Sequence, residues 1–258
     1  MNEQAEVLQI RVHGAASLPT LVFLPGIHGD WTLVRGFREA LKGRLRFVEI
    51  TYPRTLTWSL DDYAAAVEKT LAESGITEGW LLGESFGSQV TWAIAGRKNF
   101  NSRGIILAGG FVRHPMPLVV GFLYWLMPLI PVFVLRLALR VYTVAARFRF
   151  RRSPALLASL DEFFARRNML DWRAIRHRLR LIRDNDPRPI ARETHMPLYA
   201  LTGAVDPIVP WVGVKPWLQK NCPGFRGSRV IMRADHVVLA TASEASVEQV
   251  LEWVFQTG

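Results

Sequence analysis

Residues 83–87 constrain the fold of this chain more than any other segment. They read Gly-Glu-Ser-Phe-Gly and directly follow the apolar run Trp-Leu-Leu at 80–82. Ser85 therefore lies where a strand is expected to end and a helix to begin, in a tight turn that exposes a serine hydroxyl. Glycine at 83 and 87 leaves room around a serine whose backbone is strained, where a larger side chain would collide. The pattern predicts a strand–turn–helix unit with Ser85 at its apex.

Polar residues follow three other apolar segments of the chain. Residues 21–24 lead into a glycine-rich turn, Pro-Gly-Ile-His-Gly, at 25–29. Asp206 comes just after the apolar run at 198–202, and His236 comes just after residues 230–232. Ser85, Asp206 and His236 each follow a predicted strand. We therefore expect them to meet at the carboxyl edge of one parallel sheet.

The whole chain alternates between strand and helix patterns. We expect strands near residues 7–13, 20–24, 47–51, 80–83, 104–108, 198–202 and 229–233. We expect helices near residues 31–41, 60–73, 86–96, 211–219 and 243–255. Strands separated by helices favour an α/β fold, with a mostly parallel sheet and helices on both faces. A chain of 258 residues, half of them hydrophobic, is long enough for one large domain with a buried core.

These segments resemble the α/β-hydrolase superfamily, and within it the serine hydrolases that carry an inserted cap domain. The resemblance rests on the turn at 25–29, the pentapeptide at 83–87, Gly-x-x-Asp-x-x-x-Pro at 203–210 and Asp-His at 235–236. It implies an α/β-hydrolase core made of residues 1–110 and 197–258. Residues 111–196 would then be a mainly helical cap, inserted after the strand near 104–108.

Two positions depart from the pattern of many relatives. The oxyanion turn reads Pro25-Gly26 where many relatives have His-Gly, and Asp235 precedes the histidine where relatives often have glycine. Neither change removes a group that the chemistry requires.

A serine hydroxyl needs a neighbouring base to take its proton as it attacks. The order of residues assigns Ser85 as the nucleophile, His236 as the base and Asp206 as the acid that orients the imidazole. Asp235 is a rival for the acid, but neighbouring residues seldom face each other in the required geometry.

A tetrahedral intermediate needs two backbone N–H donors aimed at its oxyanion. One is expected to be the N–H of Phe86, next to the nucleophile, and by resemblance the other is the N–H of Ile27. His28 is expected to line the pocket, with a structural role in the turn as the alternative, and Glu84 is expected to shape the site. The sequence contains no metal-ligand spacing and no nucleotide motif, so we expect neither a metal nor a cofactor.

The positive charge of the chain is concentrated between residues 111 and 195. This segment contains sixteen arginines, no lysine and six acidic residues, a net charge of +10, whereas the rest of the chain is neutral overall. A basic chain can indicate nucleic acid, but no nucleic-acid-binding motif accompanies these arginines, so we expect no nucleic-acid partner. The candidate contacts with an acidic partner are Arg136, Arg140, Arg176 and Arg180. That partner is either an anionic membrane surface or an acidic acyl carrier protein, and a merely solvated face is the alternative.

Residues 171–183 have the pattern of an amphipathic helix, with Asp171 as its expected N-cap. Apolar side chains fall on one face at 172, 175, 179 and 182, and arginines crowd another at 173, 176, 180 and 183.

Residues 116–135 contain no charged side chain and are long enough to span a bilayer. A single crossing would separate Ser85 from Asp206 and His236, and Pro128 and Pro131 interrupt a helix, so we expect no transmembrane crossing. The stretch is expected either to line the pocket or to dip into one leaflet. The polar, acidic start of the chain predicts no signal peptide, and the single cysteine, at 222, fits a reducing compartment. We therefore expect a cytoplasmic protein, with peripheral attachment to a membrane as the alternative.

A serine nucleophile favours acyl transfer. The leading interpretation is a hydrolase that cleaves a carboxylic ester with an apolar acyl chain through an acyl-enzyme intermediate. One alternative is an esterase, thioesterase or acyltransferase that acts on a carrier-linked acyl chain, and another is cleavage of carbon–carbon bonds in diketones. A weakly catalytic module that binds membranes or proteins on the same scaffold is a third alternative.

Overall fold

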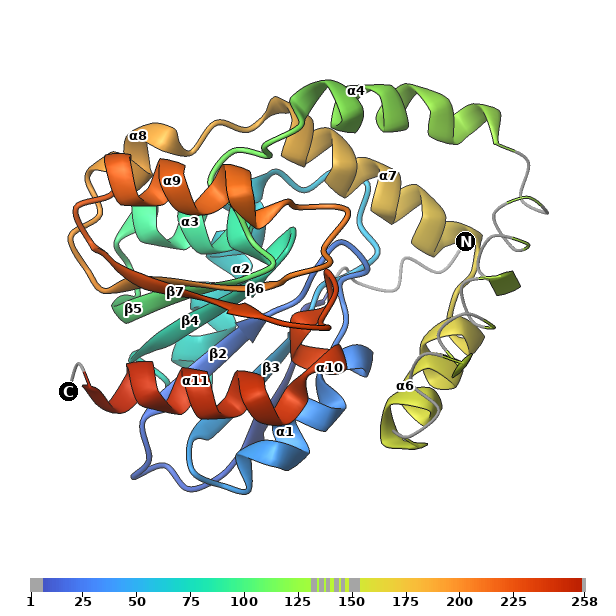
Figure 1. Cartoon of the computed structure of the whole chain (residues 1–258). Helices are drawn as coiled ribbons and strands as arrows, with labels where there is room; N and C mark the ends of the chain where they lie inside the picture. The colour runs from blue at the N-terminus through green and yellow to red at the C-terminus, as the bar shows by residue number, and fades with distance from the viewer. Residues whose placement is uncertain are drawn as a thin grey trace.

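The computed structural model describes residues 7–130, 134, 137, 140, 141, 144, 147, 148 and 154–256. Within these residues a seven-stranded sheet forms the centre of the protein, with strand order β1-β3-β2-β4-β5-β6-β7 (Figure 1). The strands are β1 (Gln9–His13), β2 (Thr20–Leu24), β3 (Arg46–Thr51), β4 (Glu78–Glu84), β5 (Asn101–Ala108), β6 (Leu198–Gly203) and β7 (Phe225–Ile231). Only the pairing of β1 with β3 is antiparallel among these strands. The predicted mostly parallel sheet is confirmed.

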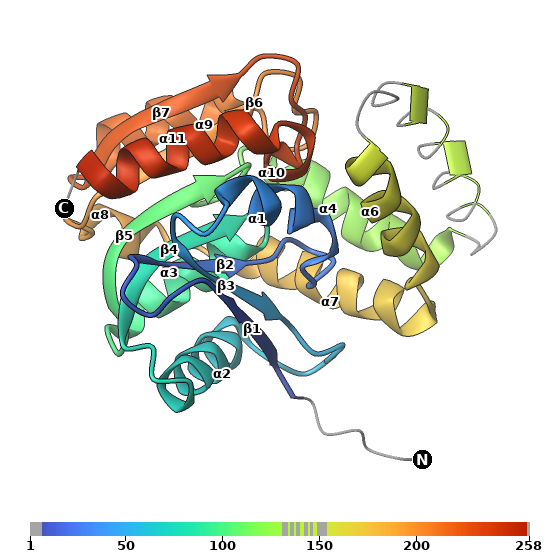
Figure 2. The ribbon, with the colours of Figure 1, turned by 90° about the horizontal axis from the view of Figure 1, so that it is seen from below.

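Helices cover both faces of the sheet, as the alternating pattern predicted (Figures 1 and 2). One face carries α1 (Arg35–Leu41), α10 (Val238–Thr241) and α11 (Ser243–Gln256), and the other carries α2 (Leu60–Glu73), α3 (Gly87–Arg97) and α9 (Trp211–Asn221). Side chains alternate along each strand, so Leu21 and Phe23 of β2 pack into the first layer while Val22 and Leu24 pack into the second. A strand buried on both faces is apolar throughout, which explains the unbroken run at 21–24.

Residues 111–196 lie between β5 and β6, and we call them the insert. The helices in the described part of the insert are α4 (Pro117–Leu126), the 3-10 turn η2 (Met127–Leu129), α6 (Pro154–Ala165), α7 (Met169–Asp184) and α8 (Arg188–Arg192). Helix α4 packs on α7, while α6 rests against α10 and the 3-10 turn η1 (Thr32–Val34). Figure 1 shows α6 and α7 beyond the ends of the parallel strands. The predicted interruption at Pro128 is present, because η2 follows α4 there. Arg136 and Pro131 lie outside the described residues.

Two sequence expectations about element ends were wrong. Helix α7 begins at Met169 and its N-cap is Asn168, whose Oδ1 accepts the N–H groups of Leu170 and Asp171 at 2.8 and 3.2 Å. Asp171 is instead the third helical residue, and its carboxylate accepts the N–H of Asn168, which completes a capping box. Strand β7 spans Phe225–Ile231 rather than residues 229–233, since Arg233 has a φ of +67° that turns the chain away from an extended path.

No helix in the described part of the chain is long and apolar enough to cross a lipid bilayer.

The turn from β4 to α3 is the tightest junction in the fold. Ser85 has a φ of +49°, in the left-handed region that L-residues rarely occupy. A Cβ on Gly87 would overlap the carbonyl oxygen of Leu24, and a Cβ on Gly83 would come within 2.9 Å of the Ser88 Cα. The two glycines are therefore required because α3 starts in contact with the end of β2, as the pentapeptide pattern predicted.

We predict opposite effects of the same substitution at two helical glycines. Gly87→Ala should lower the free energy of unfolding by about 1–3 kcal/mol, because the added methyl group overlaps backbone that cannot move away. Gly121→Ala, in α4 with no atom near the new methyl group, should raise it by roughly 0.5–1 kcal/mol. Urea denaturation followed by circular dichroism measures both, and a neutral Gly87→Ala would contradict the steric argument.

Candidate active site

Three side chains from the loops after β4, β6 and β7 meet at the carboxyl edge of the sheet. The imidazole of His236 lies between the other two, with Nε2 2.8 Å from Ser85 Oγ and Nδ1 2.8 Å from Asp206 Oδ2. With the proton on Nδ1, His236 donates to the carboxylate and accepts from the serine hydroxyl. The structure thus brings together the three residues that the sequence selected, in an arrangement suited to proton transfer from Ser85 to His236.

Asp206 is held rigidly, whereas its rival Asp235 has another role. Oδ1 of Asp206 accepts the N–H groups of Ile208 and Val209 at 2.8 and 2.9 Å, which leaves Oδ2 for the imidazole. The Asp206 side chain is fully buried. Oδ1 of Asp235 instead accepts the N–H of Val237 at 3.1 Å and the hydroxyl of Thr241 at 3.2 Å, so it stabilises the start of α10.

The glycine-rich turn after β2 lies beside the serine. A Cβ added to Gly26 would be 3.5 Å from Ser85 Cβ, which shows how closely the two segments approach. The turn is closed by a hydrogen bond from the N–H of Gly29 to the carbonyl of Gly26, 2.9 Å long. Phe86 immediately precedes α3 and its ring is fully buried. The N–H groups of Ile27 and Phe86 remain the predicted oxyanion donors.

Arg178 of α7 fastens the insert to this turn, a role that the sequence interpretation missed. Its side chain is almost completely buried, and its Nη1 and Nη2 donate to the carbonyls of Ile27 and Pro53 at 2.9 and 2.8 Å. Its Nε donates to the hydroxyl of Tyr63 at 3.3 Å. A signal was present in the sequence, since Arg178 lies on the apolar face of the amphipathic helix, between Ile175 and Ile182.

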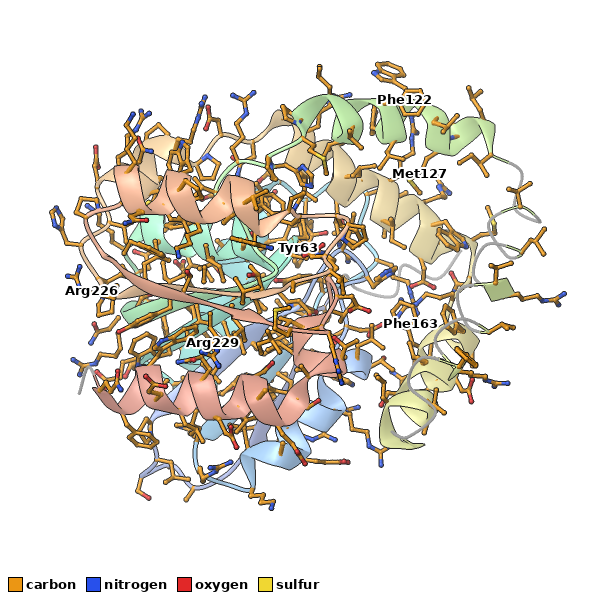
Figure 3. All side chains as sticks on the ribbon, in the orientation of Figure 1. Tyr63, Phe122, Met127, Phe163, Arg226 and Arg229 are labelled. Atoms are coloured by element: carbon orange, nitrogen blue, oxygen red, sulfur yellow. The ribbon has the colours of Figure 1, made fainter. Side chains whose placement is uncertain are left out.

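A second group of charged residues joins the start of α7 to the same region. Arg167 forms ion pairs with Asp30 and Asp171, and Asp171 also accepts a hydrogen bond from Arg54 at 2.6 Å. Phe163 of α6 stacks under the Arg167 guanidinium, 4.1 Å from the ring centre, and Figure 3 shows Phe163 between α6 and the body of the protein. The ion pair with Arg167 lowers the pKa of Asp30 despite its burial. These contacts fix the position of the insert relative to the turn at 25–30.

His28 and Glu84, the two predicted pocket residues, lie near the turn, His28 half-buried and Glu84 buried. Burial and the nearby Arg167 lower the pKa of His28 to about 3, so its imidazole is neutral at physiological pH. His28 lines a cavity of about 360 Å³ together with Tyr52, Arg54 and Asp171.

Glu84 carries its carboxyl group next to Ser85. The N–H of Gly26 donates to this carboxyl group, and a Cβ on Gly26 would be 3.6 Å from Glu84 Oε2. Burial raises the pKa of Glu84 to about 7, although the nearby His236 opposes the rise. Glu84 therefore retains its proton to a higher pH than an exposed glutamate does.

His114, at the start of the insert, lies near His236. Like Arg178, it was missed by the sequence interpretation. Its Nδ1 accepts the N–H of Met116 at 3.1 Å, and burial followed by the charge of His236 lowers its pKa to about 4. A neutral imidazole at this place adds no positive charge beside His236.

The arginines predicted to meet an acidic partner have different surroundings. Arg176 stacks on Tyr124 at 4.7 Å, and Arg180 is exposed and donates to Nδ1 of His177 at 3.1 Å. Arg140 is exposed, and Arg136 lies outside the described residues. No cluster of three or more metal-ligating side chains is found in the described part of the chain.

A sequence profile of the alpha/beta hydrolase family matches residues 21–250, so the chain belongs to this family. A comparison with curated proteins finds no match.

Solved structures with the same fold cover nearly the whole chain. A thermophilic esterase from Thermogutta terrifontis is 17% identical, covers 97% of this chain and 93% of its own, and superposes with a TM-score of 0.77. An esterase from Exiguobacterium antarcticum is 15% identical, with coverages of 96% and 95% and a TM-score of 0.76. An enol-lactonase from Burkholderia xenovorans LB400 is 17% identical, with coverages of 96% and 96% and a TM-score of 0.75. At these identities the likeness shows the fold, and the family match supports a hydrolase.

We predict that Glu84 makes the stability of the protein depend on pH. Because its pKa rises from 4.5 to about 7 on folding, its contribution is complete below pH 4.5 and is lost as the pH rises through about 7. The unfolding free energy of the wild type, relative to Glu84→Gln, should fall by about 3 kcal/mol across this range. Urea denaturation of both proteins at several pH values measures it. Glu73→Gln, at an exposed site on α2, is the control, and parallel curves for the wild type and Glu84→Gln would refute the prediction.

Proposed function

We propose that the protein is a serine hydrolase that cleaves a carboxylic ester with an apolar acyl chain through an acyl-enzyme intermediate. The observation that carries this proposal is the continuous hydrogen-bonded chain from Ser85 through His236 to Asp206. Membership in the alpha/beta hydrolase family agrees with it.

In the first half of the reaction Ser85 Oγ attacks the ester carbonyl carbon while His236 Nε2 takes the hydroxyl proton. The carbonyl oxygen becomes an oxyanion, which the N–H groups of Ile27 and Phe86 stabilise. The carbon–oxygen bond to the alcohol then breaks, His236 returns its proton to the leaving alkoxide, and an acyl-serine remains. Asp206 stabilises the imidazolium that exists between these steps.

In the second half His236 takes a proton from water, and the resulting hydroxide attacks the acyl-serine carbonyl. Collapse of this second oxyanion releases the carboxylic acid and restores Ser85 with the proton from His236. The neutral state of His114 supports this cycle, because a fixed cation beside His236 would disfavour the imidazolium.

An apolar acyl chain is supported by the side chains of the insert nearest to the core. Phe111, Val112 and Val120 belong to one buried apolar cluster with residues of α3, the helix that follows Ser85. An apolar environment next to Ser85 favours the transfer of an alkyl chain from water, so we assign the acyl portion of the substrate to this side of the site.

Substitution of the nucleophile should abolish the activity. Ser85→Ala should lower kcat for p-nitrophenyl esters by about 10⁴-fold or more and should prevent labelling by a fluorophosphonate. Ser102→Ala is the control and should behave like the wild type, because Ser102 lies at the start of β5, away from the carboxyl edge of the sheet. Esters of increasing chain length report the size of the acyl pocket in the same assay. Labelling of Ser85→Ala equal to the wild type would refute the proposal.

The two candidate acids should respond differently to the same change. Asp206→Asn should lower kcat by about 10⁴-fold, because the amide cannot hold the required tautomer and charge of His236. Asp235→Asn should keep most of the activity, since its carboxylate contacts Val237 and Thr241 instead. Steady-state kinetics of both variants measures this, and the reverse order of effects would assign Asp235 as the acid.

A further inference from the structure

Helix α4 and the turn η2 that follows it present an apolar stripe to solvent. Leu118, Phe122, Trp125 and Leu129 recur at helical spacing and are 87, 63, 67 and 76% exposed. We define these four residues as the apolar stripe. Figure 3 shows α4 along the top of the view, with Phe122 on it. Exposure of several large apolar side chains on one helix is uncommon in a soluble protein and marks a surface that is covered by something else.

The opposite side of α4 is already used by the fold. Val120 is buried against the core, and Tyr124 lies under two guanidinium groups of α7, those of Arg176 at 4.7 Å and Arg183 at 4.3 Å. The apolar stripe is therefore not the face that holds α4 on the protein. Further exposed apolar residues follow along the insert at Val134, Leu137, Val141, Val144 and Phe148.

Exposed arginines lie in the same insert as the stripe. Arg140, Arg173 and Arg180 are exposed, whereas residues 116–135 contain no charge. Arg173 and Arg180 belong to α7, which packs against α4. An uncharged apolar helix next to a helix with exposed cationic side chains matches the two layers of a membrane interface, in which acyl chains lie below anionic headgroups. A second copy of the chain would bring together two inserts with the same excess of positive charge, so charge favours a lipid surface over self-association.

We propose that the insert docks on an anionic lipid surface, with the apolar stripe of α4 immersed at the boundary between headgroups and acyl chains. The docking requires no helix to cross the bilayer. It goes beyond the proposed ester hydrolysis and does not depend on it, since binding and turnover are measured separately. The insert is also fastened to the turn beside Ser85 by Arg178, so a docked insert holds the candidate active site close to the lipid.

The experiment is co-sedimentation of the full chain with vesicles, at low salt and at about 0.1 M salt, where exposed charges are screened beyond ~10 Å. One set of vesicles contains phosphatidylcholine alone, and the other contains equal parts of phosphatidylcholine and phosphatidylglycerol. The wild type should bind the anionic vesicles, bind the neutral ones less, and lose affinity as salt is added.

The triple variant Leu118→Gln, Phe122→Gln, Trp125→Gln should lose at least tenfold in vesicle affinity. It should keep the wild-type circular dichroism and hydrolysis of a soluble ester. The matched control is Val12→Gln with Phe255→Gln, which changes exposed apolar residues on β1 and α11, outside the insert, and should bind as the wild type does. Replacement of Arg140, Arg173 and Arg180 by glutamine should remove most of the preference for anionic vesicles.

A positional probe gives an independent reading of the bound state. A cysteine at Phe122→Cys, labelled with an environment-sensitive dye, should shift its emission to the blue on anionic vesicles, whereas the same dye at Glu73→Cys on α2 should not. The native Cys222 is buried. Failure of the wild type to bind either vesicle at low salt would overturn the proposal. A dimer that the triple variant converts to a monomer, without vesicle binding, would assign the stripe to self-association and would also overturn it.

Discussion

The contact between the first turn of α3 and the end of β2 determines the position of the candidate active site. In the parallel register of β2 and β4, Leu24 stands opposite Gly83, so the turn after β2 and the turn after β4 end side by side. Gly87 then passes the Leu24 carbonyl with no room for a side chain. This forces Ser85 into its left-handed conformation and directs its hydroxyl to the edge where His236 arrives. Ser85 and the predicted oxyanion donors are thus placed by one strand register.

The insert is fixed to that edge by buried arginines rather than by an apolar interface alone. Arg178 donates to the carbonyls of Ile27 and Pro53, and Arg167 is paired with Asp30 and Asp171. A buried guanidinium costs free energy unless its donors are satisfied, so each of these groups favours one position of the insert. The turn that carries Ile27 is held in this way from the outside, which is the rigidity that an oxyanion site requires.

Local patterns in the sequence were sufficient for the sheet and for the selection of Ser85, Asp206 and His236, because strand–turn signals lie next to each of these residues. They were insufficient for Arg178 and His114, whose roles depend on partners more than a hundred residues away in sequence, such as Ile27 and His236. Asp171 was taken for an N-cap because the capping side chain of Asn168 lies outside the amphipathic pattern. Strand β7 was misplaced because an edge strand that is only half-buried carries a weak alternation.

Net charge also describes the insert incompletely, because its arginines differ in burial and in the groups that they contact. The side chains of Arg167 and Arg178 are buried and contact charged or polar groups of the core. Arg183 forms an ion pair with Asp184 and also lies over the ring of Tyr124. Charges on exposed side chains lie nearest to an approaching surface and contribute most to the attraction that it meets. Electrostatic attraction to the insert therefore depends on where its arginines lie as well as on its formal charge of +10. In the proposed docking, the uncharged stripe supplies the apolar contact with the lipid, and the exposed arginines select an anionic surface.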